Sequence, residues 1–204
     1  DRIPKKTGGI SLVHLLSDLG VIECEGTVAR LSEDQFYFLS AAVAEIHDED
    51  WLVQQCLSGE HVQIKNVTDD YGVLVLTGPK SREILRQITD ADPSNEAFPW
   101  LRCRQITVSG IPVRALRVSY VGELGWELHH PMNQMQTLYE QLHQAGKAYG
   151  LTDFGTYAVN SLRMEKAYKA WGGELTTEIT PVEADLMRFV DFSKSFIGRE
   201  ATLA

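Results

Sequence analysis

The stretch SYVGELGWEL, Ser119–Leu128, places two carboxylates among two glycines and two aromatic side chains. Glu123 and Glu127 are four residues apart, so on a regular strand they would point to the same face, although the glycines make a regular strand doubtful here. Carboxylates accept strong hydrogen bonds from N–H groups, and an acid beside a reactive nitrogen can hold its proton. The segment is a candidate binding element, and the alternative is that both acids cap a surface hairpin.

A second candidate acid is Glu25, which lies in GVIECEGTV close to Glu23. The alternative for Glu25 is an exposed acid in a loop. No metal site is predicted, because the histidines lack metal-ligand spacing and we interpret them as structural or exposed. The histidines considered for this are His14, His129 and His130.

Composition narrows the class of protein. The chain has 204 residues, 44% of them hydrophobic, which suffices for one sizeable domain or two small ones. A formal net charge of -9 argues against a nucleic-acid partner, which would need basic residues against phosphate. No apolar run approaches the about 20 residues of a membrane span, no signal peptide is visible, and no G-x-G-x-x-G follows a strand.

Cysteine usage points to a reducing compartment. Cys24, Cys56 and Cys103 are odd in number and far apart, and no pair has C-x-x-C spacing. This pattern argues against a disulfide scaffold and against structural zinc. We therefore expect the cytoplasm, or the mitochondrial matrix if the organism is eukaryotic.

The elements that must position these acids alternate between hairpins and helices. Residues 27–31 and 36–39 predict a hairpin, and CRQITVSG and IPVRALRVSY predict paired strands before GWELHH. A helix is predicted within 41–59, ending at Gly59, with an apolar stripe. Its members are Val43, Ile46, Val53 and Leu57, with Asp50 as a polar exception, and Trp51 and Leu52 widen the apolar face.

Later helices follow two prolines. Pro79 fits a first helical position before a buried stripe of Ile84, Leu85 and Ile88, and a helix after Pro131 is predicted to stop at Gly150. Its apolar face consists of Met135, Leu138, Tyr139 and Leu142. A last helix is expected to be broken by Gly172 and Gly173. The sequence therefore predicts an α+β fold of antiparallel or mixed sheets with packed helices.

Three blocks resemble the folate-binding aminomethyltransferase domain, the T-protein of the glycine cleavage system. They are SYVGELGWEL, NSLRMEKAYKAWGGELTTEITPVEADL and VDFSKSFIGREA. The branch that the chain resembles most is the C-terminal domain of dimethylglycine and sarcosine dehydrogenases, on the strength of FGTYAVNSLRMEKAYKAWGGELTTEITP. The resemblance covers nearly the whole chain. It implies one folate-binding domain over 1–204 that lacks the family's N-terminal start and C-terminal barrel.

The resemblance also implies roles for the candidate residues. Glu127 matches the acid that orients the pterin of tetrahydrofolate, and Glu123 matches an earlier acid whose task is to hold the glycine-flanked turn beside the cofactor. Tyr120 would stack on the cofactor or hydrogen-bond to it, with a core tyrosine as the alternative. Glu25 matches the catalytic aspartate, although it is one methylene longer.

Two departures weaken the match. Gly26 replaces the family's usual leucine after the catalytic acid, and Val159 stands where T-proteins carry a folate-binding arginine. Arg163, on the same helix, is interpreted as part of an exposed charge pattern of the kind formed by Glu165 and Lys169. The family's arginine for the glutamate tail lies beyond FIGREA.

The implied function is capture of a one-carbon unit, as an iminium or formaldehyde, from oxidative demethylation of an N-methyl amine such as dimethylglycine or sarcosine. The product would be methylene-tetrahydrofolate. FAD is expected only in a flavin dehydrogenase domain elsewhere in the parent chain, and the small-molecule partner is folate. Two alternatives stay open: a non-catalytic regulatory or assembly module of the same fold, and a glycine cleavage aminomethyltransferase.

Overall fold

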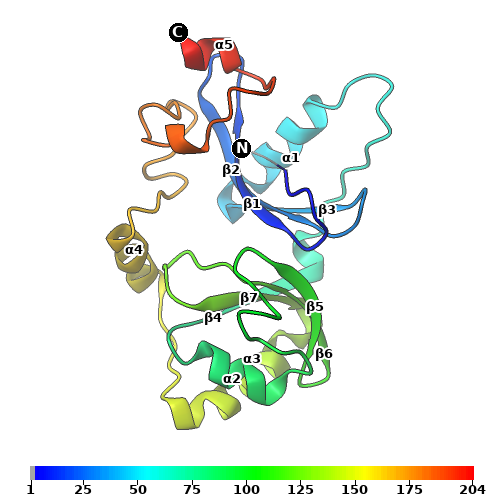
Figure 1. Cartoon of the computed structure of the whole chain (residues 1–204), viewed down its shortest axis with the longest axis vertical. Coiled ribbons are helices and arrows are strands. Elements are labelled where there is room, and N and C mark those ends of the chain that lie inside the picture. Colours follow the sequence, from blue (N-terminus) through cyan, green and yellow to red (C-terminus); the bar gives the residue numbers. More distant parts are fainter. Residues whose placement is uncertain (1–2) are drawn as a thin grey trace. The chain divides into compact units, whose positions relative to one another are not determined.

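The computed structural model describes residues 3–204, and the first two residues of the predicted domain lie outside them. The chain divides into two compact units (Figure 1). Unit 1 consists of the residues up to Asn66 together with Lys169–Ala204, and unit 2 consists of Val67–Tyr168. Within the described residues, no helix is both long enough and apolar enough to cross a membrane.

Unit 1 is built on a three-stranded antiparallel sheet in the order β1-β2-β3. The strands are β1 (Ile10–Leu16), β2 (Ile22–Arg30) and β3 (Phe36–Ser40), so the predicted hairpin is confirmed and its first strand begins earlier than expected. One end of the sheet packs against the C-terminal segment through a small core of Leu16, Ile22, Leu175, Ala184 and Leu186. That segment holds only short helices, η5 (Met187–Phe189) and α5 (Arg199–Leu203).

The predicted apolar stripe of the first helix is wrong, although Trp51 and Leu52, which widen it, are half-buried. After η1 (Ala42–Ala44), helix α1 spans Glu45–Gln54 and ends before Gly59. Its buried residue is Asp48, which lies near the thiol of Cys24 on β2. The spacing of the stripe is helical, but the stripe points to solvent, with exposed fractions of 88% for Val43, 69% for Ile46, 52% for Val53 and 70% for Leu57.

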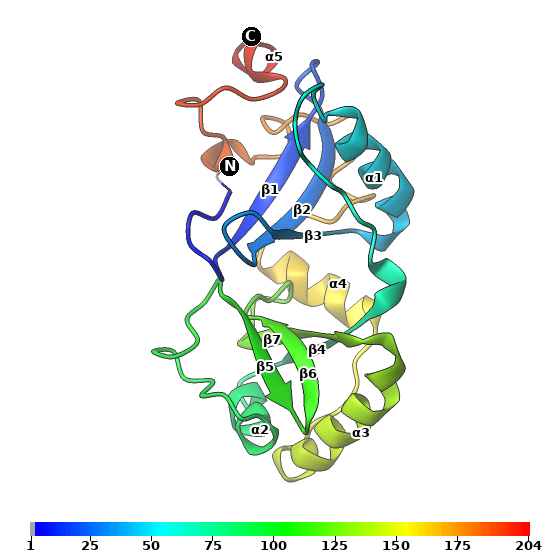
Figure 2. The same ribbon diagram turned by 90° about the vertical axis from the view of Figure 1, so that its right-hand side faces the viewer.

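Unit 2 is a four-stranded antiparallel sheet in the order β4-β7-β6-β5, with α2 and α3 packed against it (Figure 2). The strands are β4 (Tyr71–Thr77), β5 (Cys103–Val108), β6 (Ile111–Leu116) and β7 (Gly125–Pro131). The helices are α2 (Ser81–Ile88), which begins two residues after Pro79, and α3 (Met135–Gly146). Three short 3-10 helices connect them: η2 (Thr68–Asp70), η3 (Met132–Gln134) and η4 (Lys147–Tyr149).

The core of unit 2 lies between the sheet and these two helices. Ile84 and Leu85 of α2 and Leu138 and Leu142 of α3 pack on the strands, as their spacing predicts. Tyr139 is 39% exposed at the edge of this face, contrary to prediction. Its hydroxyl donates a hydrogen bond to Asp153.

Helix α4 (Thr156–Glu165) ends well before Gly172, which corrects the prediction of one helix broken at the glycine pair. The reason is Arg163, whose guanidinium donates to the carbonyl of Tyr168 at 2.8 Å and to the side chain of Asn160. These bonds reverse the chain just after the helix, where Ala167 has a φ of 56°. Arg163 is only 5% exposed, so it belongs to a buried turn and not to a surface ion pair.

Candidate functional site

Glu127 lies in the middle of β7, between Val75 of β4 and Leu116 of β6. Its side chain is 26% exposed. Since side chains alternate along a strand, Glu127 shares a face with His129, and His129 Nε2 lies 3.3 Å from Glu127 Oε2. The imidazole is 1% exposed. Glu127 is therefore a half-buried carboxylate, and its Oε2 contacts a buried histidine on the same face of β7.

The glycine-flanked segment before β7 is irregular, as the sequence suggested. Gly122 adopts a φ of 71°, which favours glycine. The backbone carbonyl of Leu124 fixes the segment, because it accepts hydrogen bonds from Gly78 N, Thr77 Oγ1 and Ser81 Oγ. These bonds do not involve the side chain of Glu123, so its expected role in holding the turn stays a prediction.

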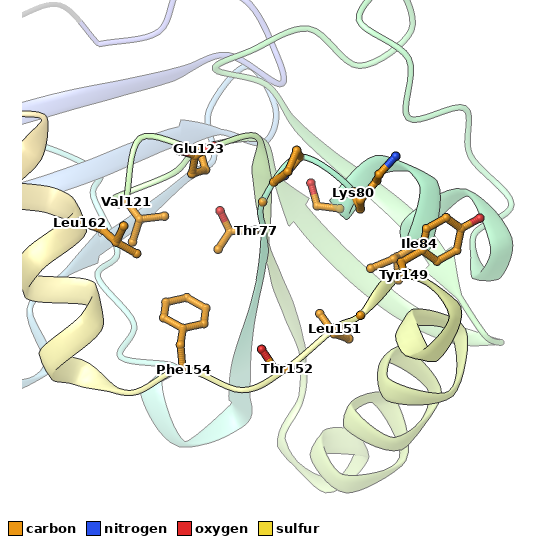
Figure 3. Close-up of a pocket in the computed structure, with 14 residues that line it drawn as sticks. Thr77, Lys80, Ile84, Val121, Glu123, Tyr149, Leu151, Thr152, Phe154 and Leu162 are labelled. Atoms are coloured by element: carbon orange, nitrogen blue, oxygen red, sulfur yellow. The ribbon is translucent and has the colours of Figure 1, made fainter.

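Glu123 instead lines a cavity of about 320 Å³ within unit 2 (Figure 3). One wall is the segment before β7, another is the start of α2, and a third is the stretch from Tyr149 to Phe154. Hydrogen bonds fix that third wall: Gln87 donates to the hydroxyl of Tyr149, and the carboxylate of Asp153 accepts from Tyr139 and contacts His143.

Most side chains around this cavity are apolar. Figure 3 shows Val121, Phe154 and Leu162 along one side and Ile84 and Leu151 along the other. Glu127 is not among the lining residues. The two acids of SYVGELGWEL therefore occupy different surroundings, which spacing alone did not indicate.

Tyr120 is 42% exposed, so it is not a core residue. Its ring lies nearly parallel to that of Tyr168, with centroids 6.5 Å apart and an interplanar angle of 18°. This arrangement leaves an aromatic surface at the start of the irregular segment. It is compatible with the predicted stacking role, which stays a prediction.

Glu25 lies inside β2, not in a loop, which excludes the looped alternative. It pairs across the hairpin with His14 of β1. His14 Nε2 and Glu25 Oε2 are 2.9 Å apart, and the side chains are 5% and 19% exposed. The ring of Phe189 lies over His14, with centroids 6.2 Å apart. Glu23 has a histidine of its own, His47, at 3.3 Å.

The predicted site residues are thus distributed over both units, with Glu25 in unit 1 and Tyr120, Glu123 and Glu127 in unit 2. Each of the two principal acids has a buried histidine partner that sequence reasoning missed. The signal for His129 was available in its i, i+2 relation to Glu127. The signal for His14 required the register of the β1–β2 hairpin, which the sequence does not specify.

Comparison with known proteins places the chain in a family. Residues 1–194 match the family model described as "GCVT N-terminal domain". Dimethylglycine dehydrogenase from Mus musculus, a mitochondrial protein, is 42% identical over 199 residues, which is 96% of this chain and 23% of that protein. The pyruvate dehydrogenase phosphatase regulatory subunit from the same species, also mitochondrial, is 30% identical over 94% of this chain and 22% of that protein.

Solved structures agree with this assignment. The glycine cleavage system aminomethyltransferase T from Bartonella henselae matches with a TM-score of 0.82 and 25% identity, covering 97% of this chain and 53% of that one. This likeness confirms the predicted α+β aminomethyltransferase fold. The chain spans less than a quarter of the length of the dehydrogenases it matches. It belongs to the GCVT N-terminal domain family, with relatives among dimethylglycine dehydrogenases and aminomethyltransferases.

Proposed function

We propose that the chain is a tetrahydrofolate-binding domain that captures the carbon released when an N-methyl amine such as dimethylglycine or sarcosine is oxidatively demethylated. The observation that carries the proposal is the environment of Glu127. Its carboxylate is half-buried, one oxygen contacts His129, and no other hydrogen bond to it is found in residues 3–204. Similarity to dimethylglycine dehydrogenase supports the choice of substrate class.

The carboxylate of Glu127 has the acceptor capacity that a pterin ring needs. A pterin presents an amino group and a neighbouring ring N–H on one edge, and a carboxylate with unused lone pairs can accept hydrogen bonds from both. Both strand neighbours of Glu127, Val75 and Leu116, are apolar. Their side chains cannot donate hydrogen bonds to the carboxylate, so its unused lone pairs can accept hydrogen bonds from a ligand.

Glu25 is the proposed proton acceptor. Bound tetrahydrofolate supplies two amine nitrogens that take up the carbon of the iminium as methylene-tetrahydrofolate, releasing the demethylated amine and one proton. Glu25 would accept that proton, and His14 at 2.9 Å would hold the carboxylate in place and share the charge change. Glu25 is proposed to act at the reacting nitrogens, whereas Glu127 binds and orients.

The test is calorimetric titration of tetrahydrofolate into the full-length protein and into its Glu127→Gln variant. Loss of charge-assisted hydrogen bonds is expected to weaken binding about 10- to 100-fold. Glu140→Gln is the matched control, because Glu140 lies exposed on α3 and bonds only to Gln136 among the described residues. A parent that does not bind tetrahydrofolate, or a Glu127→Gln variant that binds normally, contradicts the proposal.

The same titration decides the role of Glu123, which lines the separate cavity. If Glu123 contacts the folate, Glu123→Gln weakens binding. Unchanged binding removes Glu123 from the site and leaves the role of Glu127 intact. Tyr120→Leu tests the predicted stacking in the same way, because leucine fills space without an aromatic face.

A non-catalytic regulatory or assembly module is the second candidate. It is favoured by the similarity to a phosphatase regulatory subunit and by Val159, which replaces the folate-binding arginine of T-proteins. This candidate predicts no tetrahydrofolate binding by the full-length protein. The glycine cleavage alternative is disfavoured by the AWGGEL turn, in which Gly172 N donates to Leu175 O.

A further inference from the structure

His129, which contacts Glu127 on the same face of β7, has so far been given no functional role. The strand register places His129 between Val73 of β4 and Arg114 of β6. Burial of the imidazole to 1% exposure means that water cannot compete for the contact with Glu127. The 3.3 Å contact therefore links the carboxylate of Glu127, the proposed ligand-binding group, to an imidazole that is buried beside it on β7.

A carboxylate without such support can rotate about its last torsion angle and can leave the sheet face altogether. Both strand neighbours of Glu127 are apolar, Val75 on one side and Leu116 on the other. Neither can donate a hydrogen bond that would fix its orientation. The imidazole two residues further along the same strand is placed to do so.

We propose that His129 is a positioning residue that holds Oε2 of Glu127, so that Oε1 and the unused lone pairs are presented to the ligand. The inference rests on the proposed function, because it specifies how the ligand-binding carboxylate is held. Whether the imidazole is neutral with the proton on Nε2 or fully protonated, it donates to Oε2. Preorganisation of this kind raises affinity because the ligand does not have to order the carboxylate on binding.

The adjacent histidine provides an internal comparison. His130 lies on the opposite face of β7, is fully buried, and bonds through Nδ1 to the carbonyl of Pro131. Its Nε2 has no hydrogen-bond partner within the described part of the chain. His130 packs near Gly72 and Met135, away from Glu127. The same substitution at the two histidines therefore separates positioning of Glu127 from packing of the core.

The experiment measures tetrahydrofolate affinity by calorimetry in the full-length protein carrying His129→Phe, His129→Gln or His130→Phe. We expect His129→Phe to raise Kd about tenfold, as loss of one hydrogen bond to a charged group would. His129→Gln, which keeps an N–H donor, should bind within about threefold of wild type. His130→Phe should leave Kd unchanged, provided that its thermal midpoint shows a folded protein.

A double-mutant cycle distinguishes action through Glu127 from a general structural effect. In a Glu127→Gln background, His129→Phe should cause no further loss of affinity, because the carboxylate that it positions is gone. An equal tenfold loss in that background, or failure of His129→Gln to restore binding, overturns the inference. If His129→Phe binds tetrahydrofolate with wild-type affinity, the inference about His129 is overturned and the proposed function is not affected. If the wild-type protein does not bind tetrahydrofolate, both the inference and the proposed function are overturned.

A second measurement applies if His129→Phe does not fold. The imidazole ¹⁵N resonances of His129 can be followed by NMR in the wild-type protein and in Glu127→Gln. A Nε2 proton bonded to a carboxylate should shift its resonance when that oxygen becomes an amide. Unchanged His129 resonances would show that the two side chains do not interact, and the inference would fail.

Discussion

His14 and Glu25 form a half-buried pair across the β1–β2 hairpin, with 2.9 Å between Nε2 and Oε2. The pair gives the longer glutamate a fixed orientation that an isolated glutamate at the position of the family's aspartate would lack. A second acid–histidine pair, Glu127 with His129, occurs in the other unit. Each proposed functional carboxylate is therefore held by a buried imidazole.

If Glu25 accepts the proton, Glu25→Gln should slow methylene-tetrahydrofolate formation about 100-fold while tetrahydrofolate affinity stays within about twofold, because loss of a general base affects the reaction and not binding. Rates are measured with the amine substrate in the full-length protein. Glu23→Gln is the matched control, since Glu23 contacts His47 and not His14. Equal rates for Glu25→Gln and wild type would remove Glu25 from the mechanism.

Gly125, the first residue of β7, leaves no room for a side chain. A Cβ there would lie 2.8 Å from the carbonyl oxygen of Leu76 and 2.9 Å from Thr77 Oγ1. We expect Gly125→Ala to lower the free energy of unfolding by about 1–3 kcal/mol, the usual cost of overpacking, and to weaken folate binding by displacing the strand that carries Glu127.

Gly155→Ala is the control for this substitution. Nothing lies within 4 Å of the place that a Cβ would take at Gly155, and its φ of -101° suits alanine. Urea unfolding should show a loss of less than about 1 kcal/mol, because alanine is a weaker N-cap than glycine but lowers the entropy of the unfolded chain. A Gly125→Ala variant as stable as Gly155→Ala would contradict the close approach of β4 and β7.

Local patterns predicted most strands and helices, because alternation and helical spacing are properties of a few neighbouring residues. They did not predict which way a helix faces. The stripe that includes Val43 and Ile46 has core-like spacing, yet Asp48 is the inward residue and lies near the thiol of Cys24. Arg163 is buried for a similar reason, since its partner is the backbone of a turn that follows the helix.

The roles of the candidate site residues stay predictions, and the structure adds where each residue lies. Motif resemblance selected Glu25 and Glu127, but spacing suggested that Glu123 and Glu127 share a face, and the irregular backbone before β7 separates them. The histidine partners depend on strand register and burial. Both are tertiary properties, so a single sequence does not contain a local signal for them.

Exposure of the α1 stripe leads to a stability prediction. Ile46 is 69% exposed, so Ile46→Lys should change the free energy of unfolding of this chain by less than about 0.5 kcal/mol. Ile22→Lys is the contrasting variant, because Ile22 is fully buried in the core of unit 1 and an unpaired charge there should prevent folding. Chemical denaturation measures both, and a loss of more than about 2 kcal/mol for Ile46→Lys would show that the stripe is covered.

The buried thiol of Cys103 predicts a pH dependence. Burial raises the pKa of Cys103 to about 11, although the nearby charge of Arg114 opposes the shift. A thiol whose pKa is raised by folding stabilises the folded state fully below its unfolded pKa, and that contribution is lost as the pH rises through the folded value. The loss should amount to about 2–3 kcal/mol between pH 9 and pH 11.

Cys103→Ala isolates this effect, since it retains the other titrating groups and lacks only this thiol. Its unfolding free energy should fall less steeply with pH than that of wild type over the same interval. Thiol labelling at about pH 8 gives an independent check: Cys56 is exposed and should react at once, whereas Cys24 and Cys103 are buried and should react only on unfolding. Parallel pH profiles for the two proteins, together with rapid labelling of all three thiols, would contradict the burial of Cys103 within β5.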